Sequence, residues 1–329
     1  LLVVGACFWW KEHHPHKASP ALAQKNTAPQ KKPVPFPVYD SNTYPRPVRD
    51  VFEAQVTLER LHISAGSIDG ALGSQTHAAL LAFQKDMGLA ESGALDTETR
   101  SNLEMTSKAL TTYTVTSNDL ARLQPVGKTW LAKSQQTALD YETILELVSE
   151  RGHAHPNLIM RLNPSVVWTN VPAGTVLQIP DVATPAPIDK AAFILISLAG
   201  KTLDAYDAET NLLAHFPCSI AQHMDKRPVG ELHVSSIAPN PNYTFDPAVF
   251  PESEEAKQLQ MKLVLPPGPN NPVGVAWIGL DKIGYGMHGT PKPEDVGRTE
   301  SHGCFRLANW NAEFLLKIVW VGLPVYVEP

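Results

Sequence analysis

The sequence predicts a multidomain protein with a small three-helix domain, a mixed α/β segment and a mostly β, sandwich-like C-terminal domain. The chain has 329 residues, which is more than one hydrophobic core usually organises. Apolar residues follow a helical spacing after residue 50, whereas apolar stretches typical of strands follow the Pro-rich segment 183–189. These changes of pattern predict segments at 1–49, 50–106, 112–182 and 190–329.

The charge and the cysteine content argue against several classes of function. The formal net charge of −6 provides no basic surface for nucleic acid or for anionic lipid. The three cysteines, Cys7, Cys218 and Cys304, form no C-x-x-C pair and are too few for a disulfide framework. We therefore expect no metal, no cofactor and no nucleic-acid partner.

The N-terminal segment predicts export. It begins with the apolar run LLVVGACFWW, which is too short to span a bilayer and resembles the end of a signal h-region. VGAC at 4–7 resembles a lipobox, in which Cys7 would be acylated; a plain membrane anchor and an unrelated apolar start are the alternatives. A second small-residue cleavage site is ALA at 21–23. The Pro-rich residues 11–49 predict a tether, with an incidental polar tract at His13, His14 and His16.

Residues 51–105 predict three short helices. Apolar residues between 51 and 61 share one helical face, a Gly/Asp-rich break follows, and a second apolar-faced run covers 78–83. A third helix is expected near 96–105. Thr76 and Thr97 are the expected N-caps of the second and third helices, because a threonine side chain accepts from the first backbone N–H groups of a helix.

The order of short motifs in this domain resembles the bacterial three-helix peptidoglycan-binding domain. That family's repeat has D-G-x-[FL]-G-x-x-T, then A-[VL]-x-x-F-Q and G-L. This chain has DGALGSQT, ALLAFQ and MGLAESGALDTET between 51 and 103. The resemblance implies that this domain binds peptidoglycan, and a generic small helical module is the alternative.

The segment 112–182 resembles a LysM-type glycan-binding unit at its two ends, YTVTSNDL and NPSVVWTNVPAGTVLQIPD. Such a unit has an opening strand, two helices and a closing strand. The intervening PVGKTWLAKSQQTALDYETI departs from the family pattern. An unassigned linker domain is therefore the alternative to a degenerate LysM-like unit.

Cys304, within TESHGCFRLANW, is the candidate nucleophile. A thiol attacks an acyl carbon as thiolate, so it needs a base, a group that orients the base and donors for the oxyanion. His302 lies two residues before the thiol, whereas His288 would have to come from an adjacent strand. A side chain at Gly289 or Gly303 would crowd a bound acyl group or the backbone N–H groups beside it.

Other polar residues have supporting or structural interpretations. Arg306 adds a positive charge that favours the thiolate and can hold a substrate carboxylate, and Asn309 can position that arginine or the loop. Asn309 or Asn311 is also the expected N-cap of a helix over 311–320. The remaining candidates are predicted to be ordinary strand, turn or solvated residues: Cys218, His233, Asp69, Glu252, Glu254 and Glu255.

The spacing of HGT and SHGCFR resembles the L,D-transpeptidase catalytic domain of bacterial cell-wall enzymes. That family's signature is H-G-T, a loop, then [ST]-H-G-C-[IVF]-R-[LM]-x-N. The resemblance covers 192–327, with Arg227 and Leu232 replacing the threonine and the aromatic residue of a T-P-x-G-x-[FY] segment. These two departures put the substrate entrance in doubt and leave the active-site residues intact.

The resemblance assigns roles to individual residues. It implies Cys304 as nucleophile and His288 as general base, with the carbonyl of Gly289 orienting the imidazole. His302 and the N–H groups of Gly303 and Cys304 would line the oxyanion site. Arg306 would stabilise the site or bind the donor carboxylate. The motif is completed by Thr290, Ser301 and Asn309.

The combined resemblances imply an L,D-transpeptidase that cleaves the L-to-D peptide bond after the third stem residue and passes the acyl group to an amine. An L,D-carboxypeptidase or cysteine peptidase on stem peptides, and a catalytically vestigial wall-binding protein, are the alternatives. Expected partners are glycan strands and peptide stems, with an outer-membrane lipoprotein as another acceptor. The expected location is the periplasm or cell envelope, and membrane contact would come only through an N-terminal anchor such as lipidated Cys7.

Overall fold

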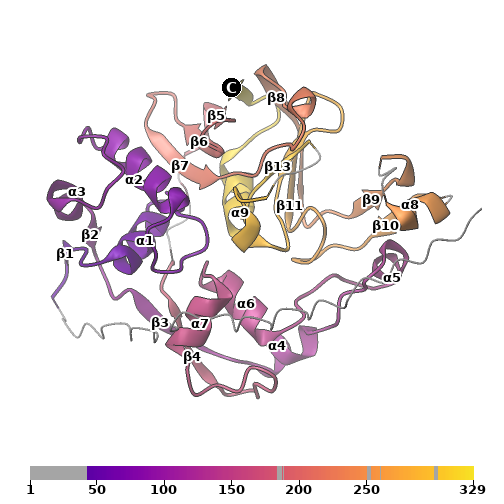
Figure 1. Ribbon diagram of the computed structural model, residues 1–329, viewed down its shortest axis with the longest axis horizontal. Helices are drawn as coiled ribbons and strands as arrows, with labels where there is room; N and C mark the ends of the chain where they lie inside the picture. Colours follow the sequence, from indigo (N-terminus) through magenta and orange to yellow (C-terminus); the bar gives the residue numbers. More distant parts are fainter. Residues whose placement is uncertain (1–42, 184–186, 188, 250–252, 260, 300–302) are drawn as a thin grey trace, which may run out of the picture. The chain divides into compact units, whose positions relative to one another are not determined.

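The computed structural model describes residues 43–183, 187, 189–249, 253–259, 261–299 and 303–329 (Figure 1). The predictions for Cys7, for the cleavage site at 21–23 and for the histidines at 13, 14 and 16 concern residues outside the described ranges. No helix within the described ranges is long and apolar enough to cross a membrane. The same ranges contain no group of three or more His, Cys, Asp and Glu side chains arranged to hold a metal ion.

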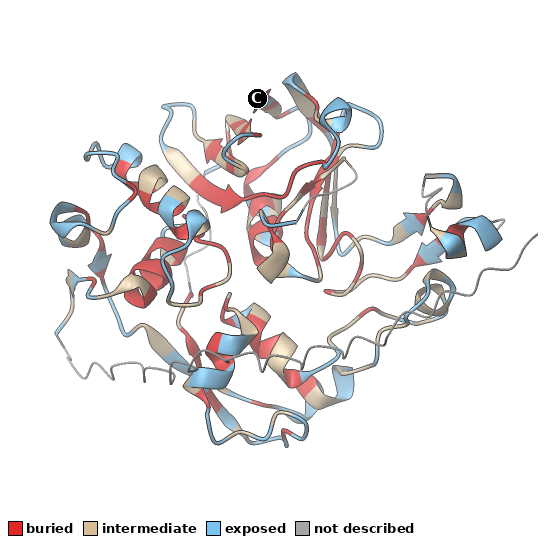
Figure 2. Ribbon diagram, viewed as in Figure 1, coloured by how far each residue is buried: buried red, intermediate tan, exposed pale blue. Residues whose placement is uncertain are grey.

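The N-terminal domain contains the three predicted helices, α1 (Val51–Arg60), α2 (Ser74–Asp86) and α3 (Thr97–Asn102). Its core is formed by apolar side chains from all parts of the domain, including Leu58, Leu80 and Leu103. Figure 2 shows the resulting concentration of buried residues along α1. The short strand β1 (Arg46–Pro47) pairs with β2 (Glu104–Met105), so the two ends of the domain are joined.

Both expected threonine caps in this domain are wrong. The side chain of Asp96, one residue before Thr97, accepts from the backbone N–H of Thr99 at 2.8 Å and caps α3. Helix α2 begins after Gly73 with no side-chain cap. Thr76 is instead buried, and its Oγ1 accepts from Nε2 of Gln55 at 3.0 Å, because a tertiary contact takes the place of a local one.

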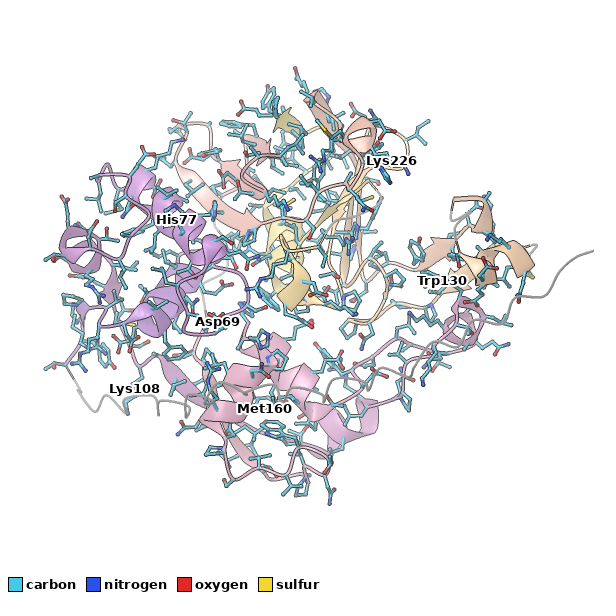
Figure 3. The ribbon with its side chains drawn as sticks, in the orientation of Figure 1. Asp69, His77, Lys108, Trp130, Met160 and Lys226 are labelled. Atoms are coloured by element: carbon cyan, nitrogen blue, oxygen red, sulfur yellow. The ribbon has the colours of Figure 1, made fainter. Side chains whose placement is uncertain are left out.

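The turn between α1 and α2 is organised by Asp69, which is labelled in Figure 3. Its Oδ1 accepts from Nε2 of Gln55 at 3.0 Å and from the backbone N–H of Ala71 at 2.8 Å. Gly70 follows with φ at 76°, in the left-handed region that favours glycine. Asp69 is therefore a turn residue, as its position in the sequence predicts.

The middle segment begins with β3 (Leu110–Thr114) and ends with β4 (Val176–Pro180), and these strands pair antiparallel. Between them lie α4 (Ser117–Arg122), α5 (Trp130–Ser134), α6 (Ile144–Arg151) and α7 (Pro156–Leu162). The expected pair of helices is thus exceeded by two. One of the two additional helices, α5, lies in the stretch that departs from the LysM pattern.

The C-terminal domain is built on one mixed sheet, which contains eight strands in the described part of the chain, in the order β13-β12-β11-β8-β14-β5-β6-β7. The bounds along the chain are β5 (Phe193–Ser197), β6 (Thr202–Tyr206), β7 (Leu212–Pro217), β8 (Gly230–Pro239), β11 (Ala276–Leu280), β12 (Gly286–His288), β13 (Phe305–Arg306) and β14 (Pro324–Glu328). Helix α9 (Asn309–Ile318) buries Ala312, Leu315 and Ile318 in the same core as the strands.

The sandwich-like arrangement expected for this domain is wrong. Ser219, two residues after the edge strand β7, forms an antiparallel bridge with Arg306 of the opposite edge strand β13. The sheet therefore curves back on itself into a half-barrel and is not covered by a second sheet. Alternating apolar residues are compatible with either architecture, because each buries one sheet face.

A smaller hairpin projects from this sheet. Strand β9 (Tyr243–Phe245) pairs antiparallel with β10 (Leu263–Leu265), and α8 (Glu254–Gln258) lies between them in the chain. The remaining helical turns are η1 (Met224–Lys226), η2 (Pro247–Val249) and η3 (Pro293–Asp295).

Candidate active site

Two short parallel strands bring the candidate nucleophile and base together. Strand β12 ends at His288, and β13 starts directly after Cys304, with His288 opposite Arg306 in the register. Alternate residues of a strand point to opposite faces. Because Met287 and Phe305 are buried in the core, Cys304, His288 and Arg306 share the other face. The prediction that His288 comes from an adjacent strand is confirmed.

Among the described residues, the thiol of Cys304 contacts backbone groups and lies under the influence of the Arg306 charge. Its Sγ–H donates to the carbonyl of Gly284 at 3.4 Å. Burial raises the pKa of Cys304 above its ordinary value, whereas a backbone hydrogen bond from Gly286 and the charge of Arg306 lower it by less. Arg306 thus acts in the expected direction but does not overcome burial. The resting thiol is protonated at neutral pH.

His288 is held in the orientation of a base. Its Nδ1 lies 2.6 Å from the carbonyl oxygen of Gly289. A carbonyl only accepts, so Nδ1 carries the hydrogen and Nε2 keeps a lone pair. Burial lowers the pKa of His288 to about 4, with the hydrogen bond to Gly289 opposing burial and Arg306 adding to it. The ring also stacks on Trp277, at a centroid separation of 5.8 Å.

Asn309 is fully buried and secures the backbone around the base. Its Oδ1 accepts from the N–H of Val275 at 3.3 Å, and its Nδ2 donates to the carbonyl of Pro269 at 3.2 Å. The expectation that Asn309 or Asn311 caps α9 is wrong, because Ala308 precedes the helix without a side-chain cap. Of the two expected roles in the site, Asn309 positions the loop and makes no hydrogen bond to Arg306 in the described contacts.

The two glycines of the site differ in what surrounds them. A Cβ at Gly289 would lie 2.2 Å from Oδ1 of Asn309, whereas a Cβ at Gly303 would meet only Tyr285, at 3.7 Å. The protein itself therefore requires glycine at 289. At 303 a Cβ would make an ordinary contact with Tyr285, so the described residues do not require glycine there.

We expect Gly289→Ala to destabilise the fold by about 2 kcal/mol, since a methyl group must displace a buried amide, and to lower turnover with it. Gly303→Ala is the matched variant: its stability should stay within about 0.5 kcal/mol of wild type, while its turnover falls because the methyl group occupies the acyl position. Thermal unfolding and initial rates measure the two effects separately. Full activity of Gly303→Ala would contradict the assignment of that space to the acyl group.

Sequence reasoning missed an aromatic wall that consists of Tyr243, Phe245 and Trp130, and a further tyrosine, Tyr285, next to the Gly284 carbonyl that accepts from the thiol. Burial, followed by the charge of Cys304, raises the pKa of Tyr243 to about 12, and burial and Cys304 also raise the pKa of Tyr285. Trp130 of the middle segment, labelled in Figure 3, stacks on Phe245 at a centroid distance of 4.3 Å and lies 6.1 Å from the ring of Tyr243. Trp130, in the stretch that departs from the LysM pattern, was the one feature of the sequence that could have indicated these aromatic contacts.

Glu255 holds this wall in place. Its carboxylate accepts from the backbone N–H groups of Trp130 at 3.0 Å and Leu131 at 3.1 Å, at the start of α5. The interpretation of Glu255 as a solvated residue is therefore wrong, because it caps a helix of another segment. Glu254 follows the prediction and pairs with Lys257 on the surface, whereas Glu252 lies outside the described residues.

The remaining residues singled out in the sequence lie partly within and partly outside the described ranges. Ser301 and His302 lie outside the described residues. Cys218 is fully buried, and burial raises its pKa to about 12, as expected of a core thiol. His233 is a strand residue of β8 whose Nδ1 lies 3.1 Å from a carboxylate oxygen of Asp281. Arg227 donates to the carbonyl of Ala221 at 2.8 Å.

A buried neutral imidazole beside a partly buried thiol, on adjacent strands of a curved mixed sheet, defines a candidate cysteine-dependent acyl-transfer domain. Residues 191–327 match the family described as "L,D-transpeptidase catalytic domain", and residues 48–103 match the one described as "Putative peptidoglycan binding domain". The chain therefore carries an L,D-transpeptidase catalytic domain preceded by a peptidoglycan-binding domain. Both resemblances inferred from the sequence are confirmed.

Curated relatives carry the same family name. The chain is 28% identical over 171 residues to "Putative L,D-transpeptidase YkuD" of Bacillus licheniformis, covering 52% of this chain and 85% of that protein. It is 31% identical over 169 residues to "Probable L,D-transpeptidase YbiS" of Escherichia coli K12, covering 51% of this chain and 54% of that protein. It thus spans about half the length of the latter.

A solved structure described as "L,D-transpeptidase from Mycobacterium smegmatis" matches with 17% identity and a TM-score of 0.34, covering 49% of this chain and 76% of that one. A TM-score at this level supports no argument about the site.

Proposed function

We propose that this protein is an L,D-transpeptidase that acts on peptidoglycan stem peptides through an acyl-enzyme on Cys304. The observation that carries the proposal is the register of β12 and β13, which puts Cys304, His288 and Arg306 on one sheet face. The hydrogen bond from Nδ1 of His288 to Gly289 supports it, because it leaves Nε2 free to accept a proton.

The reaction begins from a neutral pair. As the sulfur of Cys304 attacks the carbonyl carbon of the donor peptide bond, its proton passes to Nε2 of His288. The resemblance assigns the oxyanion to His302 and to the N–H groups of Gly303 and Cys304. The C–N bond then breaks, and His288 returns the proton to the departing amine of D-alanine. An acceptor amine attacks the thioester, loses a proton to His288 and releases the thiol.

The two domains together support an envelope location. We propose that the N-terminal domain binds peptidoglycan and keeps the catalytic domain near its stem peptides, in the manner of linked binding modules. The periplasm, a lipidated Cys7 and an outer-membrane lipoprotein as an acceptor belong to this proposal. The degenerate LysM-like segment is the second proposed contact with glycan.

The products formed from defined stem peptides test the proposal. The full chain is incubated with purified disaccharide tetrapeptides, and the products are separated by chromatography and weighed by mass spectrometry. Cross-linked dimers together with free D-alanine are the expected products. Tripeptides as the only products would show hydrolysis in place of transfer. A product profile identical to that of Cys304→Ala would overturn the enzymatic proposal.

A further inference from the structure

The middle segment contributes a carboxylate to the buried surroundings of the catalytic base. Glu150, the penultimate residue of α6, accepts from Nδ2 of Asn309 through both oxygens, at 3.1 and 3.3 Å. The hydroxyl of Tyr141, from the same segment, donates to it at 3.2 Å. Burial raises the pKa of Glu150 to about 7, whereas the hydrogen bonds from Asn309 and Tyr141 favour the carboxylate.

Glu150 completes the hydrogen bonding of the Asn309 amide. The two Nδ2 hydrogens have Glu150 and the carbonyl of Pro269 as acceptors, and Oδ1 faces the N–H of Val275. This set of partners fixes which way the amide points, since only Oδ1 can accept. Removing Glu150 would leave a buried amide hydrogen without an acceptor, which favours rotation or displacement of Asn309.

Asn309 in turn supports Gly289. Its Oδ1 lies so close to the glycine that a Cβ there would be 2.2 Å away, and a Cβ on Gly274 would meet Oδ1 and the Gly289 backbone. The N–H of Gly289 donates to Ala276 at 3.2 Å, and its carbonyl accepts from His288. A displaced Asn309 would therefore change the position of the carbonyl that orients the imidazole.

The same segment also grips the loop that carries Pro269. The backbone of Leu139 donates to the carbonyl of Pro267 and accepts from the N–H of Asn270, both at 2.9 Å. Gly268 has φ at 142°, and a Cβ there would lie 2.2 Å from the carbonyl oxygen of Leu139. Both acceptors of the Asn309 Nδ2 group, Glu150 and the carbonyl of Pro269, thus depend on the middle segment.

We propose that Glu150 is a positioning residue for catalysis, which holds Asn309 against Gly289 and through it keeps His288 aimed at Cys304. This inference rests on the proposed acyl transfer. It gives the middle segment a part in positioning the catalytic base, in addition to any contact with glycan.

Kinetics of Glu150 variants test the inference. Glu150→Ala should lower kcat by roughly tenfold to a hundredfold with little change in KM, since a small displacement of a catalytic group has effects of this size. Glu150→Gln keeps an oxygen that accepts from Asn309 and should restore most of kcat. The double variant Glu150→Ala/Asn309→Ala should be no slower than Asn309→Ala, because both changes break one chain of contacts.

Arg151→Ala is the matched control. Arg151 lies on the same helix, directly after Glu150, and its guanidinium lies over the ring of Tyr113 within the middle segment, 4.9 Å from the ring centroid. Its kcat should stay near wild type. Equal losses in Arg151→Ala and Glu150→Ala, a change in KM alone, or additive losses with Asn309→Ala would overturn the inference. If Glu150→Ala fails to fold, Glu150→Asp, whose shorter side chain draws the carboxylate away from Asn309, should show the loss of kcat, and an unchanged kcat in that variant would overturn the inference.

Alkylation of Cys304 by iodoacetamide separates this inference from the proposed function, because it needs no peptide substrate. Glu150→Ala should react more slowly than wild type near pH 7, where His288 must accept the thiol proton. The difference should shrink at high pH, where the thiol ionises unaided. Equal alkylation at every pH would overturn the inference. If Glu150→Ala is alkylated more slowly but the wild-type protein forms no product from stem peptides, only the proposed function is overturned.

Discussion

Replacing Cys304 with serine is expected to reduce product formation from stem peptides by roughly 10³-fold or more. The neighbouring base explains the size of the effect. Burial lowers the pKa of His288 to about 4, so its imidazole is a weak proton acceptor. It can assist a thiol but cannot substantially activate an alcohol, whose proton is far less acidic. Initial rates of dimer and D-alanine formation measure the loss.

Cys218 is the matched control for this experiment. It is fully buried, and its Sγ lies 3.5 Å from the carbonyl oxygen of Ser219. Cys218→Ala should keep its turnover per folded molecule. Peptide mass spectrometry after iodoacetamide or a carbapenem should find the adduct on Cys304 and not on Cys218. Preferential labelling of Cys218, or substantial activity of Cys304→Ser, would contradict the assignment.

His288→Ala is expected to lower kcat by about 10²- to 10⁴-fold, the usual contribution of a general base. The remaining rate should rise with pH, because only self-ionised Cys304 then reacts. His233→Ala, at a half-exposed residue of β8 paired with Asp281, is the control that should leave kcat unchanged.

The wild-type pH profile gives an independent check on the base. His288 must be neutral to accept a proton, so activity is present above its pKa and falls as pH drops through about 4. The rate should therefore vary little between about pH 5 and 7 on account of this residue. An acid limb near pH 6.5, the ordinary value for histidine, would show that burial does not control the base.

Site residues that belong to short sequence motifs were predictable, whereas contacts made with distant segments of the chain were not. HGT and SHGCFR identify Cys304 and His288, because strand alternation and parallel pairing suffice to bring them to one face. The carboxylate partner of Asn309 and the backbone partners of Glu255 could not be predicted, since they lie more than a hundred residues away in the chain. The sequence predicts only local roles for the two residues: Asn309 as a cap or as a support for Arg306 or the loop, and Glu255 as a turn or solvated residue.

The fold of the C-terminal domain shows the same limit. Its strands and its helix were predictable from apolar periodicity, although α9 begins two residues before the expected 311. Whether the strands form two facing sheets or one curved sheet depends on which edges meet. The two outer edges meet at the bridge between Ser219 and Arg306, and such a single contact cannot be predicted from apolar periodicity. The boundaries of the predicted segments remain predictions.

The place of β14 in the sheet has a consequence for biosynthesis. Residues 324–328 follow every other strand of the sheet in the chain, yet they lie between β8 and β5, parallel to β5 and antiparallel to β8. The strands that carry the thiol and the imidazole belong to one half of the sheet, and in the described part of the chain they join the other half through β14 and through the single bridge between Ser219 and Arg306. During synthesis the nucleophile therefore exists before its supporting scaffold can close. The sheet around the catalytic strands can be completed only once residues 324–328 have been made.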